Sequence, residues 1–244
     1  MILTIDVGNT RIKAAVFENS RLSELFVFEK ATGLTGIENI LKKYPKVIQL
    51  VVASVGNLSS EDFLAFENRV SLTFITHEFP FPFHNHYETP LTLGIDRMVL
   101  SAGAVLQFPN QNRLVIDAGS CITYDFTDAA DNYLGGAISP GLKMRYEALH
   151  HYTARLPLLE VESPKDYIGA STIQAIHSGV VNGVLHEING FIADYENQYS
   201  KFTIILTGGD TEFLAKRLKN TIFANSNFLL ESLDRTYQYK TEND

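Results

Sequence analysis

Cysteine is almost absent from this chain of 244 residues, in which Cys121 is the only one. A single cysteine cannot form an intramolecular disulfide or build a cysteine-rich zinc site, and this fits a reducing compartment. Long apolar runs are also missing. The longest, at 47–55, is interrupted by Gln49 and Ser54 and falls short of the ~18 residues that a membrane helix needs. Because residues 2–5 already have the pattern of a buried strand, no room is left for a signal peptide, and we expect a cytoplasmic protein.

Positive charge is in the minority, with 20 Lys and Arg against 28 Asp and Glu and a net charge of −8. This balance disfavours binding to nucleic acid or to anionic lipid, so we expect neither a nucleic-acid nor a membrane partner. A small anionic ligand is not excluded, because a few backbone N–H groups and one cation can hold a phosphate locally. Hydrophobic residues at 45% indicate a globular chain that can form one large domain or two.

The order of apolar patterns predicts an α/β fold whose plan occurs twice. In the first part we expect strands at 2–5, 11–17, 25–30, 47–53 and 72–76, and helices at 34–44, from Ser59 and at 94–107. In the second part we expect strands at 113–117, 121–127, 133–138 and 202–206, and helices after Gly141, at 171–197 and after Asp210. The loop at 77–93 is long enough to suggest a function, and the tail after Tyr237 is expected to be disordered. The repeated plan predicts two related halves, 1–112 and 113–244, that face each other across a cleft.

Residues 5–10 and 116–121 share one order: an apolar strand, an aspartate, a small or apolar residue, a glycine and a short polar turn. In the first segment, a positive φ at Gly8 would allow a tight turn and a close approach of ligand to backbone. Successive N–H groups in such a turn form an anion-binding concavity. A type I′ hairpin with a solvated aspartate explains each turn as well when it is considered alone.

Polar side chains around both turns suit a phosphate ligand. Asn9 and Thr10 add donors to the first turn, and Arg11 and Lys13 add positive charge. The Asp6 carboxylate of that turn can hold Mg²⁺ directly or through water. The second turn offers hydroxyl groups at Ser120 and Thr123. Neither segment matches a Walker A loop or a dinucleotide fingerprint, which excludes those nucleotide-binding classes.

Two further segments carry candidate chemistry. At 207–210, Gly208 and Gly209 would let a flat base or a ribose lie against the backbone, although a strand-to-helix turn capped by Asp210 explains the segment equally well. At the start of the helix expected from residue 94, Asp96 could accept a proton from a substrate hydroxyl and Arg97 could hold an anionic group. A helix-start acid with a neighbouring ion pair is the alternative for that segment.

Considered together and in order, five segments resemble the type III pantothenate kinases, a family of the actin-like ATPase and sugar-kinase superfamily. The segments are residues 6–10, 93–97, 117–120, 135–141 and 207–210. The resemblance implies an α/β fold of two actin-like (ribonuclease H-like) halves, with mixed central sheets and flanking helices around an ATP cleft. It also implies transfer of the γ-phosphoryl group of ATP to pantothenate, which gives 4′-phosphopantothenate, the first step of coenzyme A biosynthesis.

The resemblance also assigns site residues. The ATP-binding set is Asp6, Val7, Gly8, Asn9, Thr10, Arg11, Ile12, Lys13 and Ser120. We add Gly208 and Gly209, which would let the base or ribose of ATP lie against the backbone. The pantothenate-binding set is Tyr87, Gly94, Ile95, Asp96, Arg97 and, from the partner subunit of a homodimer, Thr172. Asp96 resembles the catalytic base, and Asp117 the ligand of a monovalent cation, K⁺ or NH₄⁺. Mg²⁺ at Asp6 completes the expected cofactors.

Two residues depart from the family pattern, and one pattern remains open. Cys121 stands where the family usually has alanine, and Ser171 where it usually has asparagine before the substrate threonine. Ala175, Gly179 and Gly183 recur at a spacing of four, which is consistent with tight core packing or with a close helix pair across a dimer interface. Two other functions remain as alternatives: a superfamily kinase or phosphatase for another small acceptor, and a nucleotide-sensing regulator without turnover.

Overall fold

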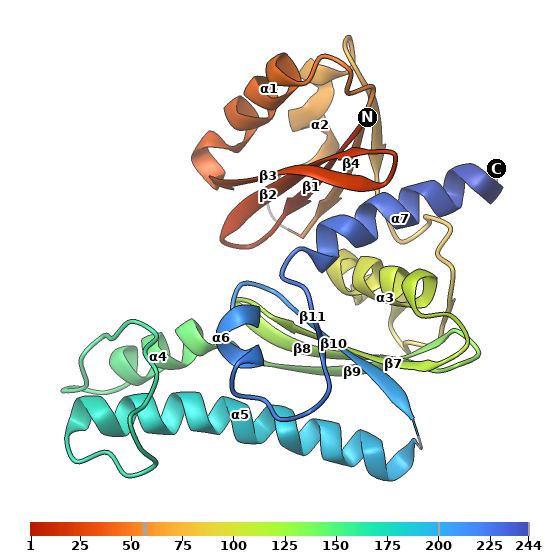
Figure 1. Cartoon of the computed structure of the whole chain (residues 1–244). Helices are drawn as coiled ribbons and strands as arrows, with labels where there is room; N and C mark the ends of the chain where they lie inside the picture. The colour runs from red at the N-terminus through yellow and green to blue at the C-terminus, as the bar shows by residue number, and fades with distance from the viewer. Residues whose placement is uncertain (56–57, 200, 244) are drawn as a thin grey trace. The chain divides into compact units, whose positions relative to one another are not determined.

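The computed structural model describes residues 1–55, 58–199 and 201–243. The described chain divides into two compact units (Figure 1). The first unit comprises Met1–Asn110, Thr127–Gly135 and Asn227–Asp244, and the second comprises Gln111–Phe126 and Gly136–Ser226. None of the helices in the described part of the chain has the length and apolar character needed to cross a membrane.

A five-stranded mixed sheet forms the centre of the first unit, in the order β3-β2-β1-β4-β5. Its strands are β1 (Ile2–Val7), β2 (Arg11–Glu18), β3 (Arg21–Glu29), β4 (Gln49–Ser54) and β5 (Ser71–Phe74). β1 pairs antiparallel with β2 and parallel with β4. Alternate residues of each strand enter different cores because side chains alternate between the two faces of a sheet. Thus Leu3 and Ile5 lie in one buried cluster, and Val51 and Ala53 of β4 lie in another.

Helices cover this sheet. The first buried cluster includes apolar residues of α1 (Gly33–Lys43) and Phe63 of α2 (Ser60–Phe63). The second includes residues of α3 (Ile95–Gln107) and α7 (Phe228–Asn243). The remaining short elements of the unit are β6 (His84–Asn85) and the 3₁₀ helices η1 (Lys30–Thr32), η2 (Leu64–Phe66) and η3 (Pro90–Thr92).

The expectation of a disordered tail after Tyr237 is wrong, because α7 continues to Asn243. Leu230 and Leu233 are buried, and a Cβ on Gly103 of α3 would overlap the hydroxyl of Ser232, so the two helices pack closely. This contact places residues 227–244 in the first compact unit, as it does residues 127–135. The boundaries of the two compact units therefore differ from the division at residue 112 that the sequence predicts.

A six-stranded mixed sheet has the order β11-β10-β7-β8-β9-β6. Besides β6, its strands are β7 (Asn112–Ala118), β8 (Cys121–Thr127), β9 (Asn132–Pro140), β10 (Phe202–Thr207) and β11 (Phe223–Ala224). β10 runs parallel to β7, and Thr207 stands opposite Asp117 in that pair. The helices of the second unit are α4 (Leu142–His151), α5 (Thr172–Gln198) and α6 (Thr211–Ala215).

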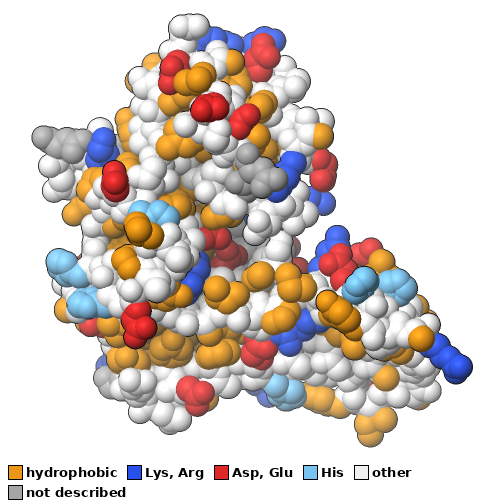
Figure 2. Space-filling model, turned by 180° about the vertical axis from the view of Figure 1, so that it is seen from behind, with side chains coloured by type: hydrophobic (Ala, Val, Ile, Leu, Met, Phe, Trp, Pro, Cys, Tyr) orange, Lys and Arg blue, Asp and Glu red, His pale blue; other side chains and the backbone are white. Residues whose placement is uncertain are grey.

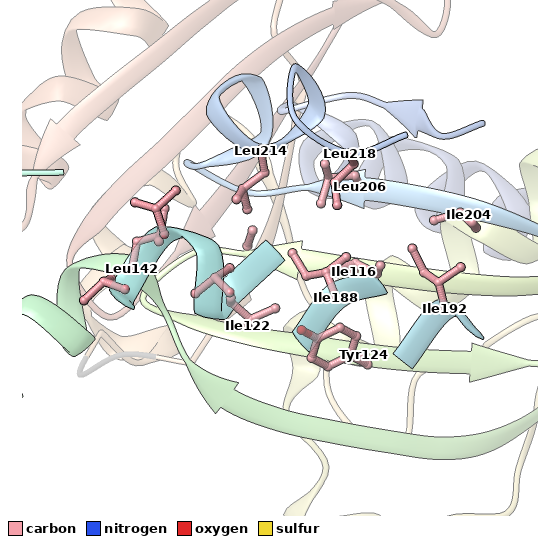
Figure 3. Packing of buried hydrophobic residues seen from close by; sticks show 14 of the residues in the cluster. Ile116, Ile122, Tyr124, Leu142, Ile188, Ile192, Ile204, Leu206, Leu214 and Leu218 are labelled. Carbon is pink, nitrogen blue, oxygen red and sulfur yellow. The ribbon is translucent and has the colours of Figure 1, made fainter. Parts of the chain in front are cut away.

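The core of the second unit forms between this sheet and α5 (Figure 3). The buried residues of α5 recur every three or four positions along one helix face and include Val184, Ile188 and Ile192. They pack with Ile116 of β7 and Tyr124 of β8. The prediction of an α/β fold with mixed sheets and flanking helices is confirmed.

Candidate active site

The first polar turn links β1 to β2. Asp6 is buried, with 8% of its surface exposed, and stands opposite Lys13 in the antiparallel pair. The Gly8 N–H donates to the Arg11 carbonyl at 3.1 Å. The prediction of a positive φ at Gly8 is wrong, and so is a type I′ turn, because neither Gly8 nor the two residues after it has a positive φ. The cause is loop length: Val7 pairs with Ile12, and the four residues between them close the hairpin without a left-handed residue.

The side chains of this turn divide between core and surface. Val7 and Ile12 are fully buried and fix the ends of the hairpin, whereas Asn9, Thr10 and Arg11 are exposed. A buried carboxylate at Asp6 thus lies on a rigid strand next to exposed donors, as a phosphate and metal site requires.

The second polar turn follows β7 and is held against the third glycine segment. Within the turn, the Gly119 N–H donates to the Cys121 carbonyl at 2.9 Å, and Ser120 is exposed. The Asp210 N–H donates to the Ala118 carbonyl at 2.9 Å, so the segment after β10 is tied to the end of β7. The structure therefore brings together the predicted residues of both segments in the second unit.

Gly208 shows why glycine is needed at this junction. Its φ is +96°, and a Cβ built on it would overlap the Asp117 carboxylate and the Ala118 carbonyl. Next to it, a Cβ on Gly209 would meet nothing within 4 Å. Asp210 occupies the N-cap position of α6 without a side-chain cap hydrogen bond, and burial raises the pKa of its carboxyl group.

Asp96 lies in the first turn of α3, after the N-cap residue Gly94. The Arg97 N–H donates to Asp96 Oδ1 at 2.8 Å. A Cβ on Gly94 would overlap this same oxygen, so the glycine leaves the space that the carboxylate occupies. Burial raises the pKa of Asp96, and the hydrogen bond from Arg97 and the Arg97 charge only partly oppose this effect.

Tyr87 and Arg97 form a contact that brings the long loop to the start of α3. The Arg97 guanidinium lies 5.6 Å from the centroid of the Tyr87 ring, and Arg97 has 5% of its surface exposed. Tyr133 of β9 lies beside the same ring, with centroids 6.2 Å apart. A Cβ on Gly135, whose φ is +102°, would stand 3.4 Å from Tyr87.

Sequence reasoning missed the contributions of Tyr133 and Gly135 to this cluster. An aromatic series continues behind Tyr133 through Phe83, Phe81 and Phe79, with centroid distances of 5.8, 5.3 and 5.8 Å. The alternating Phe-Pro pattern of the loop was the available signal, because aromatic residues at every second position can share one face. The series fixes the loop that carries Tyr87.

Thr172 is the first residue of α5 and is exposed. The Ser171 hydroxyl accepts a hydrogen bond from the Gln174 N–H at 3.3 Å and caps the helix. Serine thus fulfils the capping role at the position where the sequence departs from the family pattern.

A protein-only metal centre requires several ligating side chains grouped together. Within residues 1–55, 58–199 and 201–243, no group of three or more His, Cys, Asp and Glu side chains is arranged to hold a metal ion. Asp6 and Asp117 each offer oxygen ligands, which suit Mg²⁺ and alkali cations when substrate and water supply the remaining ligands.

The fold defines a class of protein. A glucokinase from an Antarctic psychrotroph covers 98% of each chain with a TM-score of 0.55 at 12% identity. A Campylobacter jejuni protein described as a Baf family transcriptional activator covers 98% of this chain and 99% of its own, with a TM-score of 0.64 at 24% identity. At these identities the likeness shows the fold alone, which is that of the actin-like sugar kinases.

Sequence comparison then identifies the family. The profile of the type III pantothenate kinase family matches residues 2–194. The type III pantothenate kinase of Flavobacterium johnsoniae is 69% identical over 244 residues, which is 100% of each chain. The chain belongs to the type III pantothenate kinase family, whose reaction is the phosphorylation of pantothenate in coenzyme A biosynthesis. Membership of this kinase family implies ATP as the phosphoryl donor and a divalent metal ion with it.

Proposed function

We propose that Asp96 is the general base of this pantothenate kinase. Its carboxylate accepts the proton of the primary hydroxyl of pantothenate as that oxygen attacks the γ-phosphorus of ATP, and ADP leaves with 4′-phosphopantothenate as product. The observation that carries this proposal is the Asp96 carboxyl group itself, held by the Arg97 N–H with its pKa raised by burial. A raised pKa makes a carboxylate a stronger base, provided that it is still ionised at the working pH.

The acceptor is held by the residues around Asp96. Arg97 supplies a buried positive charge for the carboxylate of pantothenate, and Tyr87 supplies an aromatic face and a hydroxyl beside it. Gly94 and Ile95 form the backbone of the same segment. The carboxylate of pantothenate is complementary to the Arg97 charge and a neutral sugar is not, which disfavours another superfamily kinase with a neutral sugar substrate.

ATP is held by two sets of residues in this proposal. The first is the β1–β2 turn, with Asp6, Val7, Gly8, Asn9, Thr10, Arg11, Ile12 and Lys13. The second is Ser120 with Gly208 and Gly209. Support comes from exposed donors next to a rigid strand in the first set, and from the hydrogen bond between Asp210 and Ala118 that joins the segments of the second.

Two cations complete the proposed site. Asp6 holds Mg²⁺, directly or through water, and Asp117 holds K⁺ or NH₄⁺. Mg²⁺ neutralises phosphate charge during transfer, which is the main requirement of phosphoryl-transfer catalysis. A Cβ on Gly208 would overlap the Asp117 carboxylate, so glycine at this position leaves the space that the proposed cation ligand occupies.

We further propose a cytoplasmic homodimer in which Thr172 contacts the substrate bound by the partner subunit. The exposed glycine at position 179 and the half-buried one at 183 support it, because a Cβ on either would meet nothing within 4 Å, unlike a tightly packed core position. Tyr152 and Ile168 of the preceding segment are 83% and 84% exposed. Figure 2 shows hydrophobic side chains among polar and charged ones on the surface at the end of this unit that carries α4. A partner copy would cover this surface.

The decisive experiment replaces the base. Asp96→Asn should abolish phosphorylation of pantothenate, while ATP binding measured by calorimetry is retained and the melting temperature is no lower than that of wild type. Turnover at the wild-type rate in this variant would refute the assigned role. Wild-type assays with pantothenate and other acceptors, each with and without potassium, separate this reading from another kinase and from a nucleotide-sensing regulator.

A further inference from the structure

Arg145 of α4 makes three polar contacts, two with the segment before its own helix and one with Glu187 of α5. Its Nε donates to the Pro140 carbonyl at 2.8 Å, and its Nη2 donates to the Ser139 hydroxyl at 2.7 Å. The same Nη2 lies 2.5 Å from Glu187 Oε2, and the two side chains of this ion pair are 22% and 24% exposed. A guanidinium suits this arrangement because it presents several N–H groups in one rigid plane.

Glu187 of α5 is held from a second side. The hydroxyl of Tyr124, a fully buried residue of β8, donates to Glu187 Oε1 at 2.9 Å. Burial acts to raise the pKa of Glu187, but the hydrogen bonds from Arg145, Ser139 and Tyr124 outweigh it and lower the pKa. The net lowering means that the folded protein stabilises the ionised carboxylate, so Arg145 faces a fixed negative charge.

Residues 139–141 rest on the second polar turn. The Gly141 N–H donates to the Ser120 carbonyl at 3.1 Å. A Cβ on Gly141 would stand 2.6 Å from the same oxygen and would overlap the Gly119 carbonyl. The two backbone segments are therefore in direct contact, and a shift of residues 139–141 must displace the turn at Ser120 or break this hydrogen bond.

We propose that Arg145, fixed by Glu187, is a positioning residue for the second phosphate turn. Its guanidinium binds the Ser139 hydroxyl and the Pro140 carbonyl. The next residue, Gly141, is hydrogen-bonded to the Ser120 carbonyl, so Arg145 indirectly holds the Ser120 backbone where ATP binds. This inference rests on the proposed function, in which Ser120 contacts ATP. Arg145 itself touches neither substrate in this proposal, so its loss acts on ATP binding and leaves binding of pantothenate unchanged.

The alternative is a plain structural brace between α4 and α5, and steady-state kinetics separate the two. Arg145→Met keeps the length of the side chain and removes every donor, whereas Arg145→Lys keeps the charge and loses the planar donor set. Ile188→Val, in the core of α5, is the matched control, because it removes one buried methyl group and no hydrogen-bond donor and so lowers only the melting temperature. The melting temperature of each variant is measured alongside KM for ATP and KM for pantothenate.

For Arg145→Met we expect KM for ATP to rise about tenfold, while KM for pantothenate stays within about twofold of wild type. Arg145→Lys should raise KM for ATP by less, and the control should leave both KM values unchanged. If Arg145→Met and Arg145→Lys lower only the melting temperature, as the control does, Arg145 is a brace and the inference is overturned. Ser120→Ala separates this failure from that of the proposed function. If KM for ATP rises in Ser120→Ala but not in Arg145→Met, only the positioning role of Arg145 is refuted. If KM for ATP is unchanged in Ser120→Ala, the contact between Ser120 and ATP is refuted, and the positioning role of Arg145 is refuted as well.

Discussion

Gly94 and Asp96 lie in close contact at the start of α3, where a Cβ on Gly94 would overlap Asp96 Oδ1. That oxygen also accepts the Arg97 N–H at 2.8 Å. The orientation of the Asp96 carboxylate, the proposed base, thus depends on the absence of a side chain at Gly94. The glycine backbone has ordinary angles, with φ −58° and ψ 135°, so alanine is excluded by space and not by conformation.

The first prediction follows from this relationship. Gly94→Ala should reduce kcat by about 10–100-fold, because the added methyl group turns the carboxylate of Asp96 away from the reacting hydroxyl. The melting temperature should change little, because the backbone angles suit alanine. Leu91→Ala, at a position that is 77% exposed in the preceding 3₁₀ helix, is the control and should retain wild-type kcat. Wild-type kcat in Gly94→Ala would show that Asp96 does not need this orientation.

The second prediction concerns pH. Burial raises the pKa of Asp96 above its ordinary 3.8, and the base must be ionised to act. The midpoint of the acid limb of kcat/KM should therefore lie above pH 3.8. Activity should be lost as the pH falls through this midpoint, because Asp96 is then protonated. A limb governed by an unshifted carboxyl group, with its midpoint at or below 3.8, would contradict the burial of Asp96.

The same shift predicts a stability difference of known sign. A folded-state pKa above the unfolded value means that ionisation of Asp96 opposes folding, so its contribution is favourable at low pH and is lost as the pH rises through the folded pKa. Asp96→Asn should therefore be more stable than wild type at neutral pH, and the gap should close below pH 3.8. Urea unfolding of both proteins across this range measures it. Equal stability at pH 7 would count against a pKa of Asp96 raised by burial.

The third prediction tests the support of Tyr87. Gly135→Ala puts a Cβ 3.4 Å from the Tyr87 ring at a φ of +102°, which alanine adopts with strain. We expect KM for pantothenate to rise several-fold, with KM for ATP unchanged. Leu134→Ala, on the same strand and 45% exposed, is the control. A rise in KM for ATP instead would show that Tyr87 is not part of the acceptor site.

The fourth prediction compares adjacent glycines. Gly208→Ala should lower stability by about 1–3 kcal/mol and weaken activation by potassium, because its Cβ overlaps the Asp117 carboxylate and its φ of +96° is strained for alanine. Gly209→Ala should leave the melting temperature near wild type, because its Cβ meets nothing within 4 Å. Potassium titration and thermal unfolding test both. Equal stability of the two variants would refute the packing argument at Gly208.

The fifth prediction tests α7. Leu233 is fully buried between α7 and the first sheet, so Leu233→Ala should reduce the free energy of unfolding by about 2–5 kcal/mol. Glu242→Ala, exposed on the same helix, should have a small effect. A small effect at Leu233 would mean that the C-terminal helix contributes little to the first unit.

Local patterns predicted most elements well, since the pattern of apolar residues depends on which faces of a strand or helix are buried. The runs around Ile5 and Ile116 gave β1 and β7 within two residues at each end. The C-terminal helix was missed because residues 228–243 are mostly polar, and only their packing on α3 shows which of them are buried. The expected positive φ at Gly8 failed for a related reason: the register of β1 against β2, not the glycine, sets the length of that loop.

The sequence by itself determined the α/β class, the order of the segments that resemble a kinase family, and the candidates Asp6, Asp96 and Asp117. The α/β class and each candidate can be seen in short segments, whereas the choice among their alternative explanations rests on the resemblance of five segments taken together. Only the tertiary structure decided that Gly135 supports Tyr87 and that Glu187 faces Arg145, because these pairs lie more than 40 positions apart. For Asp96, the local sequence placed the carboxylate at a helix start, and burial in the folded protein raised its pKa.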